Sequence, residues 1–380
     1  MLNLQRPDTR SHEVVVRSLT DDPYSNTMAL GCPECPHFSE CGGLSVRASL
    51  VDCLELCCGD SAHCTRVCRH KPQLFVQQMR EVGGLNFEGI PRTSDCSSQL
   101  SADIVPLIYH GSSRTTALAG KAFALRLSDL IDFKRGKLHF ETREALCQAY
   151  SINPTADLVL TGVNHDHRIE PWWTLGEKRI AIIKAMKELG IALVTTPNFS
   201  LLLDNPRTDD LHAMKRIAIT FEEFQREGLP CALHPNGRTY RDFERWSKFI
   251  AERSEIETLA YEFITGSGQK LRTQFHLDRL ADLVKASGRA LDIVVRGDPQ
   301  VIPFLRQFYR HVIYIETNAF MKTLKRRRAE RLDNDALRWP SAPTIVGETV
   351  DTLLIHNVEE QIAFLRATYY GCDAPFAKAA

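Results

Sequence analysis

Short apolar runs alternate with stretches of helical period from about residue 103 onward. Each run holds several aliphatic or aromatic residues and ends in a polar cluster, as buried strands do. The eight runs are 104–111, 157–166, 191–199, 230–237, 258–268, 290–298, 312–318 and 351–357. Between the runs, apolar residues recur every three or four positions in 177–189 and 211–224, which predicts amphipathic helices. The pattern therefore predicts a regular alternation of strands and helices.

Capping residues stand where the predicted helices should begin and end. Thr239 is followed three positions later by Asp242, the arrangement of a capping box, and Asp298 precedes Pro299 as an N-cap precedes a first helical turn. Glycines stand where a helix should end before the next strand, at Gly190, Gly228 and Gly288. These signals support the same division into elements.

Eight strand–helix units fit a (β/α)8, TIM-like barrel, which places the fold in the α/β class. A doubly wound parallel sheet is the alternative. Segment 112–156 is longer than one crossover needs and predicts an insertion, with 121–140 as a hairpin inside it. The predicted division of the chain is a polar arm at 1–30, a cysteine-rich module at 31–75 and the barrel at 76–380.

Cysteine is concentrated near the start of the chain, where residues 31–70 hold eight of the 12 cysteines. The first residues contain no long apolar run, so we expect no signal peptide and a cytoplasmic setting, in which disulfides are rare. Clustered thiolates then indicate a structural zinc site, and an iron–sulfur cluster is the alternative group that they could bind. If the cysteines bind no metal, they are buried thiols or form disulfides. The expected metal ligands are Cys32, Cys35, Cys41, Cys53, Cys57, Cys58, Cys64 and Cys68.

The composition of the chain limits the kinds of partner that we expect. The formal net charge is zero, 25% of the residues are charged and 43% are hydrophobic, which is ordinary for a soluble protein with a large core. No segment approaches the roughly 18 apolar residues of a membrane span, so we expect no membrane partner. The composition does not indicate an oligomeric state.

The polar clusters that end the runs supply the candidate site, because the active site of such a barrel lies at the carboxyl ends of its strands. A carboxylate inside a barrel is costly unless it is paired or functional, and an arginine fork suits an anion such as phosphate. The candidate catalytic residues are Glu262, Asp166, His234 and Glu316. The candidate substrate-binding residues are His110, Asn164, Asn198, Asn236, Arg296, Trp172 and Trp173. The alternative is a structural role: a hydrogen-bonded core histidine for His234, and packing of the loop for the paired tryptophans.

A basic stretch, FMKTLKRRRAER at 320–331, follows the seventh run. We expect it to form a helix beside the barrel mouth that contacts nucleic-acid phosphates, with a solvated helix face as the alternative. Its candidate phosphate-binding residues are Lys322, Lys325, Arg326, Arg327 and Arg328.

A soluble barrel with a cysteine cluster, mouth carboxylates and this basic stretch resembles the tRNA-guanine transglycosylase superfamily, which includes DNA-directed relatives that exchange or excise bases, some in phage defence. The resemblance covers residues 100–370 at the level of architecture. The superfamily's CxCxxC zinc pattern is absent, so no catalytic residue is carried over by position.

These features together predict a nucleobase glycosylase or transglycosylase that acts on a modified base in DNA or RNA, with DNA favoured and RNA left open. Cleavage of an N-glycosidic bond passes through an oxocarbenium-like sugar, which a carboxylate stabilises while an acid assists the leaving base. Two alternatives stay open: a barrel hydrolase or lyase that acts on a free small molecule, and a nucleic-acid-binding module without catalysis.

Overall fold

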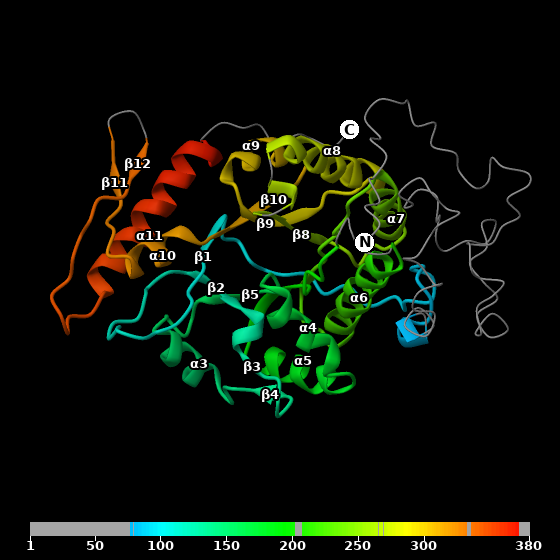
Figure 1. Ribbon diagram of the computed structural model, residues 1–380, viewed down its shortest axis with the longest axis horizontal. Helices are drawn as coiled ribbons and strands as arrows, with labels where there is room; N and C mark the ends of the chain where they lie inside the picture. The colour runs from blue at the N-terminus through cyan, green and yellow to red at the C-terminus, as the bar shows by residue number, and fades with distance from the viewer. Residues whose placement is uncertain are drawn as a thin grey trace, which may run out of the picture. The chain divides into compact units, whose positions relative to one another are not determined.

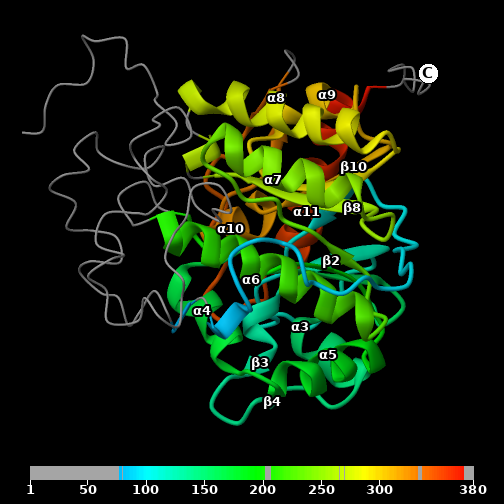
Figure 2. The ribbon, with the colours of Figure 1, turned by 90° about the vertical axis from the view of Figure 1, so that its right-hand side faces the viewer.

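The structure is a computed structural model that describes residues 77–78, 80–201, 207–264, 266–268, 270–332 and 336–371 (Figures 1 and 2). The chain divides into two compact units: residues 1–89 with 201–215, and residues 90–200 with 216–380. All strands of the described residues belong to the second unit. The polar arm predicted at 1–30 and the metal-binding cysteines of the module predicted at 31–75 lie outside the described residues, so both stay predictions.

Eight strands form two four-stranded sheets in which every neighbouring pair is parallel, so the α/β class is confirmed. The first sheet has the order β1 (Ile104–Pro106), β10 (His311–Glu316), β9 (Asp292–Gly297) and β8 (Thr258–Phe263). The second has the order β2 (Ala122–Arg126), β5 (Asp157–Thr161), β6 (Ile191–Thr195) and β7 (Cys231–Ala232).

Single parallel bridges connect the edge strands of the two sheets. One bridge joins Leu107, just after β1, to Ala124 of β2, and the other joins Leu233, just after β7, to Leu259 of β8. Backbone hydrogen bonds accompany both bridges: the amide of Ile108 donates to the Ala124 oxygen at 2.9 Å, and the amide of Leu233 donates to the oxygen of Thr258 at 3.0 Å.

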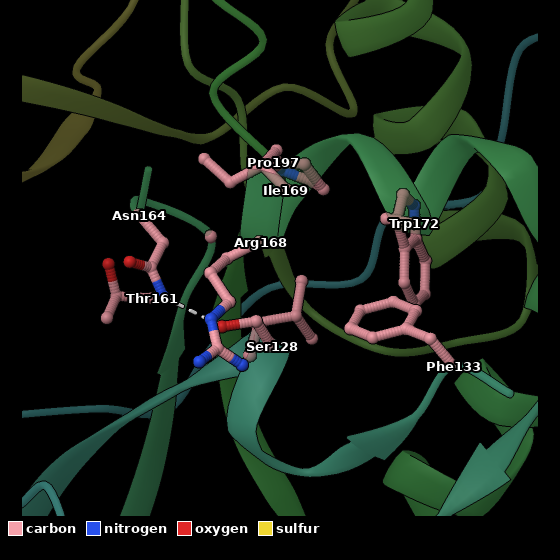
Figure 3. A pocket seen from close by; sticks show the side chains of 10 residues that line it. Ser128, Phe133, Thr161, Asn164, Arg168, Ile169, Trp172 and Pro197 are labelled. Atoms are coloured by element: carbon pink, nitrogen blue, oxygen red, sulfur yellow. Dashed lines mark hydrogen bonds between the residues drawn. The ribbon is translucent and has the colours of Figure 1, made fainter. Parts of the chain in front are cut away.

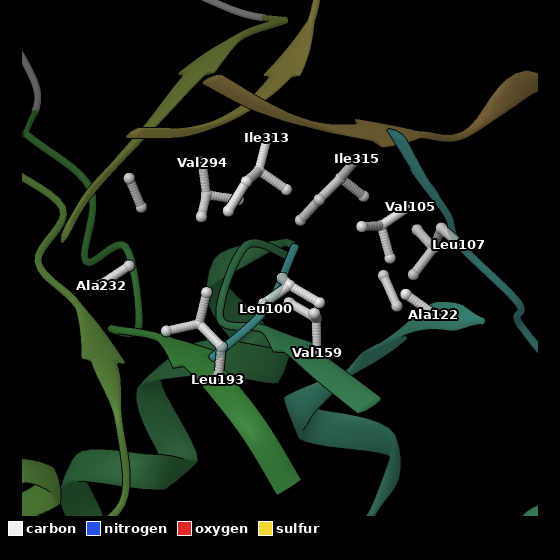
Figure 4. Close-up of a cluster of buried hydrophobic side chains, with 12 residues drawn as sticks. Leu100, Val105, Leu107, Ala122, Val159, Leu193, Ala232, Val294, Ile313 and Ile315 are labelled. Atoms are coloured by element: carbon white, nitrogen blue, oxygen red, sulfur yellow. The ribbon is translucent and has the colours of Figure 1, made fainter. Parts of the chain in front are cut away.

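One apolar cluster takes side chains from all eight of these strands or from the residue that follows them (Figure 4). Its members are the fully or almost fully buried residues Leu100, Val105, Leu107, Ala122, Ala124, Val159, Leu193, Ala232, Ala260, Val294, Ile313 and Ile315. Alternate residues of a strand point to the same face, so one face of each sheet is turned into this cluster. Strands buried on both faces read as continuous apolar runs, which is why the sequence marks them clearly.

Helices connect the strands and cover their outer faces (Figure 1). They are α3 (Arg143–Tyr150), α4 (Asp166–Thr174), α5 (Lys178–Glu188), α6 (Arg207–Arg226), α7 (Tyr240–Ala251), α8 (Lys270–Ser287), α9 (Ile302–Leu305), α10 (Asn318–Leu324) and α11 (Asp351–Leu365). Short helical turns lie at Leu127–Asp129, Gly266–Gly268, Pro299–Val301 and Arg366–Tyr370. Helices α7 and α8 pack side by side (Figure 2). No helix of the described residues is long and apolar enough to cross a membrane.

The predicted helix boundaries are confirmed where capping residues marked them. Thr239 and Asp242 form a reciprocal capping box at the start of α7, and the Asp298 side chain caps the turn that begins at Pro299. The three predicted stop glycines all adopt positive φ angles between 61° and 73°, at Gly190, Gly228 and Gly288.

Two predictions about the strands are wrong. The run 351–357 lies within helix α11, and the eighth parallel strand is instead β2, which lies inside the segment 112–156 that we predicted as an insertion. The same segment does contain a hairpin, formed by β3 (Ile131–Asp132) and β4 (Lys137–Leu138). A second short antiparallel pair, β11 (Glu330–Arg331) with β12 (Leu337–Arg338), follows α10.

Gly297 ends β9, and we expect it to be intolerant of any side chain. Its φ is 111°, in the region that favours glycine, and an added Cβ would collide with the backbone oxygen of Phe263. Gly297→Ala should therefore lower the free energy of unfolding by about 1–3 kcal/mol, as measured by urea unfolding. Gly288→Ala is the control, because Gly288 also has a positive φ, 61°, but faces open space. Equal losses for the two variants would contradict the collision.

Candidate functional site

A glutamate and two asparagines from three successive strand ends form a hydrogen-bonded chain. Glu262 lies near the end of β8, and its Oε2 accepts a long hydrogen bond from Nδ2 of Asn198 at 3.5 Å. Asn198 follows β6, and its Oδ1 accepts from Nδ2 of Asn236, which follows β7, at 2.7 Å. The structure therefore brings together three residues that the sequence predicted for the site.

Arg296 lies beside Glu262 because β8 and β9 pair in register, with Glu262 opposite Arg296. Ala260 and Val294, two residues earlier on each strand, point into the apolar cluster, so the two charged side chains continue the same face at the strand ends. Nη1 of Arg296 donates to the oxygen of Val163 at 3.0 Å, and its Nε is buried without an acceptor in the described part of the chain. The guanidinium thus keeps donors for a further group.

The surroundings of Glu262 have opposing effects on the pKa of its carboxyl. Burial raises its pKa above the ordinary 4.5, while the positive charge of Arg296, the Asn198 hydrogen bond and His165 act in the opposite direction. The net result is a raised pKa, so protonated Glu262 persists to a higher pH than in an exposed glutamate. Such a carboxyl can act as a general acid when it is protonated and as a general base when it is ionised.

A small open hollow lies against the segment that follows β5 (Figure 3). Gly162 belongs to its lining, and the oxygen of Gly162 accepts from the amide of Asn198 at 3.1 Å. An added Cβ at Gly162 would lie 2.5 Å from the oxygens of Thr195 and Thr196, so only glycine fits there. The hollow is lined by Leu127, Ser128, Phe133, Thr161, Gly162, Asn164, Arg168, Ile169, Trp172 and Pro197.

Two of the lining residues, Asn164 and Trp172, were predicted from the sequence. Nδ2 of Asn164 donates to Oγ of Ser128 at 2.9 Å. Trp172 is almost completely buried and stacks on Phe224 with ring centroids 5.4 Å apart. Sequence reasoning missed Arg168, although it stands four residues before Trp172 and therefore shares a face of α4, a spacing that could have pointed to it.

His234 is placed differently from Glu262 and Arg296. Its ring stacks on Tyr261 with centroids 5.2 Å apart, and the hydroxyl of Tyr261 contacts Nδ1 of His276 on α8 at 2.7 Å. Both ring nitrogens of His234 are buried and lack a partner among the described residues. Burial lowers the pKa of His234 to about 3, so the ring is neutral at neutral pH.

Glu316 also sits apart from Glu262. It follows Ile315, which points into the apolar cluster, so its side chain leaves β10 on the opposite face. Its Oε1 accepts from the backbone amides of Asn318 and Ala319, at 2.5 and 3.1 Å, at the start of α10. Burial raises the pKa of Glu316 to about 7. The geometry is that of a carboxyl that caps a helix from within the protein.

Three further candidates do not join the Glu262 chain. Asp166 begins α4, and its Oδ1 accepts from Oγ of Ser200 at 2.6 Å. His110 follows β1 and packs edge-on against Phe320 at 5.0 Å. Trp173 packs under the guanidinium of Arg179, whose Cζ lies 4.4 Å from the ring centroid.

The basic stretch is not one continuous helix, so this prediction is wrong. Helix α10 ends at Leu324, and Arg326 has a φ of 51°, which breaks the helical path before β11 begins at Glu330. Arg326 donates to Thr344 at 2.7 Å, and the Nζ of Lys322 lies 5.6 Å from the ring centroid of Trp339. None of the five predicted phosphate-binding cations has a carboxylate within ion-pair distance in the described segments: Lys322, Lys325, Arg326, Arg327 and Arg328.

Across the described residues, no group of three or more histidine, cysteine or acidic side chains is arranged to hold a metal ion. Comparison with protein-family models gives no match, and no curated protein is detectably similar to the chain.

Proposed function

We propose that the two parallel sheets form one closed (β/α)8 ring and that its carboxyl end carries the active site of a nucleobase glycosylase or transglycosylase. The two interstrand bridges and the apolar cluster shared by all eight strands support closure. In such a ring, catalytic residues come from the ends of several strands, as Glu262, Arg296 and Asn198 do.

Glu262 carries the proposal, because it is a half-buried carboxyl with a raised pKa, and it pairs in register with an arginine that has spare donors. In its protonated form, Glu262 gives its proton to the leaving base while the C1′–N bond breaks. The resulting carboxylate accepts a proton from the water, or from the incoming base, that adds to C1′. Glu262 is then protonated again, so one group serves both halves of the reaction.

Arg296 and Asn198 support this cycle by favouring the ionised form of Glu262 once the proton has left. Burial favours the neutral form and raises the pKa, so Glu262 holds its proton to a higher pH than an exposed glutamate does. His234 takes no part, because a buried neutral imidazole has no acidic proton to give to the base at neutral pH.

The direct test is base release. The full chain is incubated with unmodified DNA, phage DNA that contains modified bases, and tRNA, and free bases and abasic sites are measured by mass spectrometry. We expect a free base and a matching abasic or exchanged site in one of these substrates. Absence of both from all three would overturn the proposed reaction.

A second candidate is a hydrolase or lyase that acts on a free small molecule. The hollow favours it, because it is a concave site lined by a few polar groups and by the rings of Phe133 and Trp172, as small-ligand sites are. Release of a base from a free nucleoside or nucleotide, but from no polymer, would support this candidate against the first.

Nucleic-acid binding by the segment after α10 makes a separate prediction. Lys325, Arg327 and Arg328 are exposed, so their combined change to glutamine should weaken duplex DNA binding with little effect on folding. The slope of log affinity against log salt should fall by about 0.9 for each phosphate that the variant no longer neutralises. The matched control changes Lys134, Arg135 and Lys137, three exposed cations of the β3–β4 hairpin. Equal slopes for the two triple variants would place the DNA surface elsewhere.

A further inference from the structure

Two acidic side chains near the hollow are paired with arginines, whereas the arginine of its lining is not. Asp129 pairs with Arg126 at 2.5 Å, and Glu170 on α4 pairs with Arg216 at 2.6 Å. Arg168 is an exposed side chain on the wall of the hollow, and no carboxylate in the described part of the chain lies within ion-pair distance of it. The hollow therefore has one uncompensated positive charge.

The polar groups beside Arg168 are mainly hydrogen-bond donors. Figure 3 shows the Arg168 guanidinium on the same side of the hollow as Ser128 and Asn164. The amide oxygen of Asn164 is occupied by the backbone amide of His165 at 2.9 Å, while its Nδ2 uses one of two hydrogens on Ser128. One amide hydrogen and the five-donor guanidinium fork thus remain available to a ligand with several acceptor oxygens.

A buried donor in the same wall lacks an acceptor. Trp172 is 1% exposed, and its indole Nε1 has no hydrogen-bond partner among the described residues. A buried donor without a partner costs roughly 1–3 kcal/mol. The rings of Phe133 and Trp172 supply an apolar side against which a sugar or base can pack (Figure 3).

We propose that this hollow binds a phosphate group of the substrate, with Arg168 as its anion-binding residue and Asn164 as a supporting hydrogen-bond donor. The assignment rests on the proposed function, and it makes the substrate a phosphorylated nucleoside, either a free nucleotide or one residue of a strand. A phosphate here lies beside the Gly162–Asn164 segment, whose other contacts lead to Asn198 and Arg296. The site would thus hold one end of the nucleotide while Glu262 acts at its glycosidic bond.

Isothermal titration of the full chain at constant ionic strength tests the assignment. The probes are a nucleoside, its 5′-monophosphate and a dinucleotide with one phosphodiester. The wild-type protein should bind at least one phosphate-bearing probe about tenfold or more tightly than the nucleoside. Preference for the monophosphate indicates a free nucleotide, and preference for the dinucleotide indicates an internal phosphate of a strand.

Variants locate the phosphate. Arg168→Gln should reduce the affinity of the phosphate probes to that of the nucleoside, and Arg168→Lys should retain part of the preference because it keeps the charge and loses the fork. Arg135→Gln, an exposed arginine of the β3–β4 hairpin, should bind as wild type does. Both arginines lie at the surface, and circular dichroism checks that each variant folds.

The outcomes separate the two proposals. Equal wild-type affinity for nucleoside and phosphate probes, no binding of either, or a preference that survives in Arg168→Gln would overturn the phosphate assignment, even if bases are released. A preference that Arg168→Gln abolishes, together with no base release from any substrate, would overturn the glycosidic reaction and leave the phosphate site standing.

Discussion

Changing Glu262 to glutamine is expected to lower the rate of base release by about 10²–10⁴-fold, the usual contribution of a general acid–base residue. The amide cannot give or accept the proton in the proposed cycle, but it fills the same volume and can still accept from Asn198. The rate measured under single-turnover conditions should fall, while the affinity for the substrate should change little.

The pH profile adds a signature that a structural role would not produce. If protonated Glu262 assists the leaving base, the rate should decrease as the pH rises through its raised pKa. This limb of the profile should be absent from the residual activity of Glu262→Gln.

Glu316→Gln is the matched control, because it removes a buried carboxyl of raised pKa at the end of a nearby strand. The glutamine oxygen can still accept from the amides at the start of α10, so activity should be retained. A large loss in Glu316→Gln with none in Glu262→Gln would exchange the two roles and overturn the proposed site.

The strand ends were predictable because buried strands have apolar residues at alternate positions, and this pattern can be recognised in the sequence. Ala260 before Glu262 and Val294 before Arg296 are small or branched residues that face the apolar cluster, so the next residue on that face emerges where the strand ends. Alternation gives a residue's face as long as the chain stays extended. It therefore placed Glu262 beside Arg296.

The same rule did not apply to His234. Strand β7 spans only Cys231–Ala232, so His234 lies beyond the extended segment and its ring turns toward Tyr261. The sequence could not show where the strand stops, because "PCALHPNG" continues to look like an apolar run with a polar end.

Helix and strand were confused where the pattern was short. Ala122–Arg126 reads AFALR, in which alanine and leucine favour helix, yet pairing with β5 makes it a strand. Residues 351–357 look like a strand by local composition, but the buried positions Leu354, Val358 and Leu365 recur at helical spacing once α11 is followed to its end. Strand pairing decided the first case, and the longer helical pattern decided the second.

The largest effect expected on stability is acid destabilisation through the buried histidines. Burial lowers the pKa of His234 to about 3 and that of His276 to about 4, against 6.5 for an unperturbed histidine. Between pH 6.5 and these values, the unfolded chain binds protons that the folded chain does not, so the free energy of unfolding falls as the pH falls. The contribution is fully present above pH 6.5. Glu316 acts in the opposite direction between pH 7 and 4.5, because its raised pKa lets the folded state hold a proton there.

Urea unfolding at pH 7 and pH 4.5 measures the effect. At pH 4.5, two units below the ordinary histidine pKa, His234 alone should lower the free energy of unfolding by on the order of 2 kcal/mol. His234→Phe keeps an aromatic ring to stack on Tyr261 and removes the titrating group, so it should lose correspondingly less stability over this interval. His139→Gln, which changes an exposed histidine, should lose as much as the wild type. If wild type and His234→Phe lose the same amount, His234 does not stay neutral in the folded protein, and its place in the packing against Tyr261 must be revised.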